Sequence, residues 1–404
     1  LRETQPPGPG PYVTANGPLS PPVVARGITV GVGEPPRHWE AMSVLRITDP
    51  FHGAVLNRHH GKEAAGTLRI TVRGECPPYG KVTVNGTPAT VGGGHFEAPV
   101  SLMARETDVV AVYEGSYGHL EHQVRVVWDK HSFPRYRVAL DDNSFFLRDI
   151  ARKGYDSIFG CHYLSLLRRM HVEYGTKFTT NIYYEADDGF RLTEFPETYR
   201  AEFEANADWL GLTFHAYSDK PDRPYQYASG DQLMRDLALV EEQVKRFAGE
   251  PTWITPTLVH WGMVTPDGLA ALARYGVRVL SGYWEPSPWG YDVSYWTDDA
   301  KSDYLHRHDC MKDFATGIVF SRIDIVINNT PIDQIDGRLD PLVDDPNHAE
   351  IMDLLTHEQY FWDFYANYIP DHPERLERAI RWVTDHGYKP VFFHQGFLGA
   401  PDGE

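Results

Sequence analysis

Two adjacent aspartates, Asp141 and Asp142, close the apolar run that begins at Val138. Carboxylates at the end of a buried strand can bind a metal ion or move a proton. The same residues also suit the start of a helix, because Asp and Asn are favoured N-caps and residues 145–152 could continue a helix. The run by itself leaves both interpretations open.

Two later segments also carry a polar residue directly after an apolar run. His215 follows residues 210–214, and His357 closes residues 351–356. In sheets of parallel strands the carboxyl ends of the strands meet at one edge, where active sites are built. Three such strand ends predict one shared pocket.

Composition sets the limits within which this pocket must be built. The chain has 404 residues, of which 42% are hydrophobic, so two modules with ample cores are expected. The net charge of −18 is spread along the sequence without a basic cluster, so nucleic acid is not an expected partner. The longest apolar runs have only the length of a strand, so no membrane span is expected. Three distant cysteines, Cys76, Cys161 and Cys310, suggest neither a thiolate metal site nor a disulfide framework.

The first part of the chain predicts a proline-rich leader and an all-β module. Nine of the first 40 residues are proline, which favours an extended leader over residues 1–41. Short strand-like runs then follow within residues 42–129, with a turn signal at Asn85–Gly86, and together they indicate a β-sandwich. These runs are 44–47, 68–73, 82–84, 98–102, 109–113 and 124–128.

From residue 135 to residue 404 the rhythm changes to alternating strands and helices. Helical spacing of apolar residues is seen at 163–174, 232–247, 269–275 and 375–386. Strand-like runs stand at 177–184, 256–259, 276–280 and 388–393. Such alternation predicts parallel βαβ units and a closed or nearly closed (β/α) barrel of the α/β class.

Taken in order, these segments resemble the polysaccharide deacetylases of the NodB-homology type, carbohydrate esterase family 4. The family motif Thr-Phe-Asp-Asp is matched by residues 139–142, His-Ser/Thr-x-x-His by residues 215–219, and Leu-x-His by residues 355–357. The resemblance covers about residues 136–398 and implies a NodB-like (β/α) barrel. Residues 81–86 and 94–100 resemble bacterial immunoglobulin-like modules, which implies an immunoglobulin-like sandwich before that barrel.

The resemblance gives each matched position a role. Asp142 and His215 would bind one divalent metal, with zinc as the expected ion. Asp141 would be the general base and His357 the general acid. A mixed carboxylate and imidazole set suits such a cation and leaves positions open for water and a substrate carbonyl oxygen.

Two departures from the family pattern concern the third metal ligand. Asp219 stands where the family has its second metal-binding histidine, and it could either bind the metal or pair with Lys220 or Arg223. The motif Arg-x-Pro-Tyr is missing, and His260 lies in the segment that takes its place. Either Asp219 or His260 could therefore complete the metal site, and His260 could instead replace the arginine that orients the base or be a purely structural histidine.

Aromatic residues predict a sugar-binding surface, since aromatic faces stack on sugar rings. We select Trp261, Tyr283 and Trp284 as candidate substrate-binding residues. A loop packed by its own aromatic side chains is the alternative for the cluster that contains the last two, which is Tyr283, Trp284, Trp289, Tyr291, Tyr295 and Trp296.

The sequence thus predicts a metal-dependent hydrolase that deacetylates an amide or ester on a poly- or oligosaccharide. A glycoside hydrolase or lyase that uses carboxylates such as Glu185, Asp187, Asp188 or Glu358 is one alternative, and a non-catalytic carbohydrate-binding protein is another. A secreted or periplasmic location is expected, although no signal peptide is visible. Neither the particular sugar nor the oligomeric state can be read from the sequence.

Overall fold

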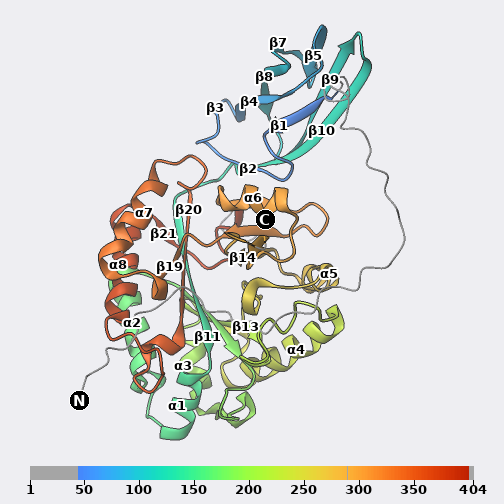
Figure 1. Cartoon of the computed structure of the whole chain (residues 1–404). Helices are drawn as coiled ribbons and strands as arrows, with labels where there is room; N and C mark the ends of the chain where they lie inside the picture. Colours follow the sequence, from blue (N-terminus) through green and yellow to red (C-terminus); the bar gives the residue numbers. More distant parts are fainter. Residues whose placement is uncertain (1–43, 289, 400–404) are drawn as a thin grey trace, which may run out of the picture.

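The computed structural model describes residues 44–288 and 290–399 of the chain, in which an all-β part is followed by a mixed α/β part (Figure 1). The leader expected at 1–41 lies outside these residues. No helix among the described residues is long and apolar enough to cross a bilayer.

The all-β part consists of two five-stranded sheets. Along β8, buried and exposed side chains alternate strictly, which is the pattern of a strand with one face on a core. The first sheet contains β1 (Arg46–Asp49), β4 (Thr67–Glu75), β8 (His95–Leu102) and β7 (Thr90–Gly92), with β3 (Lys62–Ala64) paired to β4. The second contains β2 (Val55–Leu56), β10 (Gly118–Trp128), β9 (Glu106–Gly115), β5 (Gly80–Val84) and β6 (Thr87–Pro88). The immunoglobulin-like assignment of this part stays a prediction.

The α/β part is built on a six-stranded sheet whose pairings are all parallel. Its strands are β13 (Leu210–Ala216), β12 (Phe178–Tyr183), β11 (Arg135–Asn143), β20 (Ile351–His357) and β19 (Ile325–Val326), with β21 (Lys389–Pro390) also paired to β11. A second sheet contains β14 (Val279–Gly282), β18 (Val319–Arg322) and β17 (Cys310–Lys312). A small hairpin of β15 (Glu285–Ser287) and β16 (Gly290–Asp292) completes the strands described.

Of the two expected arrangements, a closed or a nearly closed barrel, the closed one is not formed by the described residues. Residues 254–257 lie between β13 and β14 and make isolated backbone hydrogen bonds to each, from Ile254 N–H to Leu212 O and from Ser281 N–H to Thr257 O. Residues 256–259, predicted as a strand, do not form one. Pro256 has no N–H to donate to a ladder, which is one physical reason for the break.

Helices cover the outside of the sheets (Figure 1). The helices predicted at 163–174, 232–247, 269–275 and 375–386 are confirmed as α2 (His162–Tyr174), α4 (Gly230–Phe247), α5 (Pro266–Tyr275) and α8 (His372–Asp385). The structure adds α1 (Phe145–Lys153), α3 (Arg200–Glu204), α6 (Asp299–His306) and α7 (Ile335–Val343). The Asp141 segment is a strand end, because β11 extends to Asn143, and although a helix follows at Phe145, its N-cap residue is Ser144 and not an Asp or Asn of this segment.

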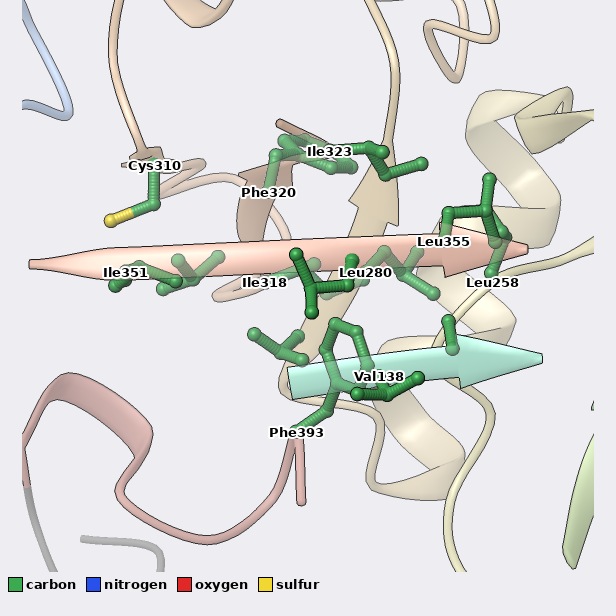
Figure 2. Packing of buried hydrophobic residues seen from close by; sticks show 14 of the residues in the cluster. Val138, Leu258, Leu280, Cys310, Ile318, Phe320, Ile323, Ile351, Leu355 and Phe393 are labelled. Carbon is green, nitrogen blue, oxygen red and sulfur yellow. The ribbon is translucent and has the colours of Figure 1, made fainter. Parts of the chain in front are cut away.

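The core of the α/β part lies between its two sheets. Figure 2 shows Val138 of β11 and Leu355 of β20 packed with Leu280 of β14 and Phe320 of β18. All four side chains are buried. This shared core holds the second sheet against the first, although no continuous ladder joins them.

Candidate metal centre

Parallel pairing brings the ends of three strands together. In the register between β11 and β20, Asp141 lies opposite His357. Strand β12 lies between β11 and β13, and β13 carries His215 near its end. The predicted gathering of polar strand ends is therefore present in the structure.

Asp142, His215 and His260 form a compact group that could hold a metal ion. His215 Nε2 is 3.2 Å from Asp142 Oδ1 and 3.0 Å from His260 Nδ1. His260 Nδ1 is 3.4 Å from Asp142 Oδ1. Two ligand atoms that are each about 2.1 Å from a tetrahedral ion are about 3.4 Å apart, so the three separations suit one divalent cation.

The backbone and neighbouring side chains orient these three residues. Asp142 lies in the left-handed region with a φ of 58°, which turns its side chain at the end of the strand. His215 Nδ1 donates to Leu258 O at 2.9 Å, which leaves its Nε2 lone pair facing Asp142 and His260. Asp142 accepts hydrogen bonds from the Tyr183 hydroxyl and, at 2.8 Å, from Gln359 Nε2.

Charges in the site shift the pKa values of its acids and of His215. Burial alone would raise the pKa of Asp142, but hydrogen bonds to His215 and His260 hold that pKa well below its usual range. Burial raises the pKa of Asp141, and the nearby His215 and His357 only partly oppose it. Burial lowers the pKa of His215, but Asp141 and Asp142 outweigh burial and the net shift is upward. Asp142 is thus the carboxylate best suited to bind a cation, and Asp141 the better proton acceptor.

Asp141 and His357 each have one fixed partner outside the metal-ligand group. Asp141 Oδ1 accepts a hydrogen bond of 2.7 Å from Asn181 Nδ2, and its Oδ2 is 3.9 Å from His215 Nε2. His357 Nδ1 is 2.8 Å from Asn328 Oδ1 and must donate to it, because that amide oxygen can only accept. His357 Nε2 is then left for proton transfer.

The two candidates for third ligand are placed differently. His260 belongs to the metal-ligand group, whereas Asp219 does not. Asp219 Oδ1 lies 3.8 Å from His260 Nε2, on the far side of that ring, and Asp219 Oδ2 is 3.3 Å from Lys220 Nζ. This geometry favours His260 as the ligand, with Asp219 in an outer position.

The three aromatic candidates also differ in their surroundings. Trp261 is half-buried and stacks under the Arg223 guanidinium at 4.7 Å, next to His260. Tyr283 is half-buried as well. Trp284 has no exposed surface, packs against Tyr295 and Phe320, and donates its indole N–H to Thr297. In this structure Trp284 is a core residue and offers no face to a sugar. Trp289, from the same loop, lies outside the described residues.

Sequence reasoning missed four residues that hold the site: Asn181, Tyr183, Asn328 and Gln359. Asn181 and Tyr183 stand two positions apart in β12, so they share one face of the sheet, and that spacing was a usable signal. Asn328 and Gln359 carried no such signal, because each reaches the site from a 3₁₀ turn.

The carboxylates considered for a glycosidase are mostly engaged elsewhere. Glu358 is buried and accepts three backbone N–H bonds, from Ser144, Phe145 and Phe146 at 2.6–2.8 Å. Glu185 pairs with Arg191. Asp188 pairs with Arg148 and Arg152. Asp187 lies at the surface, where partial loss of solvent and the negative charge of Asp219 raise its pKa.

No protein-family model and no curated protein sequence matches the chain. Among solved structures, the chain is similar to a family 4 acetyl xylan esterase from Clostridium thermocellum in complex with a cobalt ion, with 14% identity and a TM-score of 0.30. That likeness covers 64% of this chain and 87% of the esterase. An engineered protein shares 22% identity at a TM-score of 0.17, over 21% of this chain and 20% of its own length. Both TM-scores are low, so neither likeness assigns a function to this chain.

Proposed function

We propose that this protein is a metal-dependent hydrolase that removes an acetyl group from an amide or ester on a carbohydrate. The observation that carries the proposal is the Asp142–His215–His260 group beside the pair of Asp141 and His357. These residues come from the segments that resemble the deacetylase motifs, with His260 in place of the missing histidine. The proposal includes a secreted or periplasmic location and separate modules at 42–129 and 135–404.

The residues of the site suit each step of such a hydrolysis. A divalent cation held by Asp142, His215 and His260 would lower the pKa of a water molecule and polarise the substrate carbonyl. Asp141, whose pKa is raised, takes the proton of the attacking water. His357, oriented by Asn328, donates a proton to the leaving amine or alcohol. The pairing of β11 with β20 holds the base and the acid on adjacent strands.

The two alternatives have weaker support. A glycoside hydrolase needs two carboxyl groups about 5–10 Å apart and free to act, whereas Glu185, Asp188 and Glu358 are tied to Arg side chains or backbone N–H groups. A binding protein has no need for a buried carboxylate of raised pKa beside a metal-ligand group. We therefore place hydrolysis first.

The test is acetate release by the full chain, reconstituted with zinc, from N-acetylglucosamine oligomers and acetylated xylan. Asp141→Asn and His357→Ala should each keep the metal and lose about 10²–10⁴-fold in turnover. Asp385→Asn and His386→Ala, exposed residues at the C-terminal end of α8, serve as matched controls and should keep full turnover. Turnover by Asp141→Asn and His357→Ala equal to that of these controls would refute the assignment.

A further inference from the structure

A second group of metal-ligand residues is buried near the start of β20. Asp309 precedes β17, Asp324 lies between β18 and β19, and His348 comes three residues before β20. One ligand atom from each lies within 4.8 Å of the others. Their side chains are only 10%, 1% and 7% exposed. His357 closes the opposite end of β20, so this group is separate from the candidate centre.

Backbone hydrogen bonds fix one oxygen of each carboxylate. Asp309 Oδ2 accepts from Ile351 N–H at 3.1 Å, and Asp324 Oδ2 accepts from Asp353 N–H at 2.8 Å. Both donors belong to β20, and Figure 2 shows Cys310, the neighbour of Asp309, near Ile351 at the start of that strand. Asp309 Oδ1 is directed toward His348, whereas Asp324 Oδ1 lies between His348 and Arg322 Nη1, from which it accepts a hydrogen bond of 3.2 Å. The two acids are therefore held in place before any ligand arrives.

Two buried atoms of this group have no hydrogen-bond partner among the described residues, namely Asp309 Oδ1 and His348 Nδ1. They lie 3.5 Å apart, and His348 Nδ1 is 3.9 Å from Asp324 Oδ1. A hydrogen bond between a charged imidazole and a carboxylate would be about 2.7–2.9 Å long. The wider separation fits two bonds of about 2.1 Å to a shared ion.

In the described part of the chain, the surrounding charges leave one acid with His348 as its ion-pair partner and no Arg or Lys. Asp353 pairs with Arg137 at 2.6 Å, and Asp324 lies 3.2 Å from Arg322. Asp309 has no Arg or Lys partner among the ion pairs of the described residues, and it lines a cavity of about 10 Å³. A cavity of that size holds about one water molecule, which could complete the coordination of an ion.

We propose that Asp309, Asp324 and His348 bind a second divalent transition-metal ion, which ties β17 and the β18–β19 segment to β20. Two carboxylates and an imidazole suit zinc, manganese or cobalt. The ion would join the two sheets where no ladder connects them. The site does not depend on the proposed hydrolysis, so loss of one assignment leaves the other open to test.

The decisive protein is the full chain with Asp142→Ala and His215→Ala, in which the first group is destroyed and the second is unaltered. After chelator treatment it is titrated with Zn²⁺ alone, and bound zinc is counted by atomic spectroscopy after dialysis. We expect one equivalent of zinc per chain and a rise of several degrees in Tm on zinc addition. A folded double variant that binds no zinc would overturn the proposal and leave His348 in a metal-free ion pair.

Two further substitutions in that background locate the ion. His348→Gln should abolish both the bound zinc and the Tm rise, whereas His386→Gln, at an exposed histidine, should keep both. Full retention of zinc by a folded His348→Gln protein would also overturn the assignment. If His348→Gln does not fold, the zinc content and Tm shift of the double variant decide the matter, because its second group is intact.

Discussion

At the scale of single residues, the candidate centre depends on what holds Asp142. The Tyr183 hydroxyl donates to Asp142 Oδ1 and also lies 3.0 Å from His260 Nδ1. Burial, followed by the charge of Asp142, raises the pKa of Tyr183 far above its usual range, so this hydroxyl stays a donor. Outer hydrogen bonds of this kind orient metal ligands and increase their affinity for the ion.

Tyr183→Phe should therefore weaken zinc binding about 10–100-fold without unfolding the protein. The matched control is Tyr184→Phe, because Tyr184 is the next residue and packs instead on Tyr217. Zinc titration with a competing chelator measures both dissociation constants. Equal affinities in the two variants would show that Tyr183 does not support the ligand.

The raised pKa of His215 makes zinc binding at the first group depend on pH. Below that pKa the His215 imidazole is protonated and cannot bind a metal, so affinity should fall at least about tenfold per pH unit as the pH decreases. Asp142 adds little to this pH dependence of zinc affinity, because its pKa lies far below the pH range in which His215 loses its proton. The pH below which zinc affinity begins to fall, called the midpoint here, should lie above the ordinary pKa of a histidine.

Asp141→Asn provides the check on this pH dependence. It removes a charge that raises the pKa of His215, so the midpoint should move to lower pH. Zinc titrations in the Asp309→Asn background, at several pH values, isolate the first group. A midpoint that stays fixed, or moves to higher pH, would contradict the assigned coupling.

Local pattern identified the residues at strand ends but left two candidates for the third ligand, Asp219 and His260. Asp141, Asp142, His215 and His357 each follow an apolar run, and parallel pairing brings such ends together. His260 stood beside Asp219 as an equal alternative, because its position depends on a turn in which Trp261 has a φ of 62°. The spacing of apolar residues in the sequence does not predict that turn.

At the scale of secondary-structure elements, Glu358 joins the end of β20 to the start of α1. Ser144, at the N-terminus of α1, makes no side-chain cap, and the carboxylate of Glu358 accepts the first backbone N–H groups instead. Only Asn143 separates these residues from Asp141 and Asp142. The contact therefore fixes the loop that carries the proposed base and metal ligand.

Glu358→Ala should lower the free energy of unfolding by about 2–4 kcal/mol, because three buried donors lose their acceptor. Glu242→Ala, an exposed glutamate on α4, should change it by less than about 0.5 kcal/mol. Urea unfolding followed by circular dichroism measures both. A Glu358→Ala protein as stable as Glu242→Ala would remove Glu358 from this role.

Helices were easier to predict than the joining of the two sheets. Apolar spacing was enough for α2, α4, α5 and α8, since each buries one continuous face. Pro256 was a local signal against a strand at 256–259, whereas the passage of the chain from β18 to β19 depends on contacts between distant segments. Sequence pattern therefore predicted the class of the fold but not the open arrangement of its sheets.

At the scale of the whole molecule, Glu350 joins the all-β part to the α/β part. Its buried carboxylate accepts hydrogen bonds from Arg58 at 2.5 Å and from Ser132, and it lies 2.9 Å from His59 Nε2. Nearby, Lys312 N–H donates to Gly53 O and Phe51 stacks on Tyr304. These contacts connect β2 and its flanking loops with the region around β17 and α6 (Figure 1).

Glu350→Gln should loosen this junction, because one amide cannot replace the charged acceptor shared by three donors. A loss of about 1–3 kcal/mol is expected, seen in calorimetry as a lower Tm or as separation of one transition into two. Glu97→Gln is the matched control, because Glu97 pairs with Arg73 where both side chains are more than half exposed. Such exposed pairs contribute about 0–1 kcal/mol. If Glu350→Gln and Glu97→Gln have the same Tm and the same number of unfolding transitions, the two parts must be held together by the apolar and backbone contacts alone.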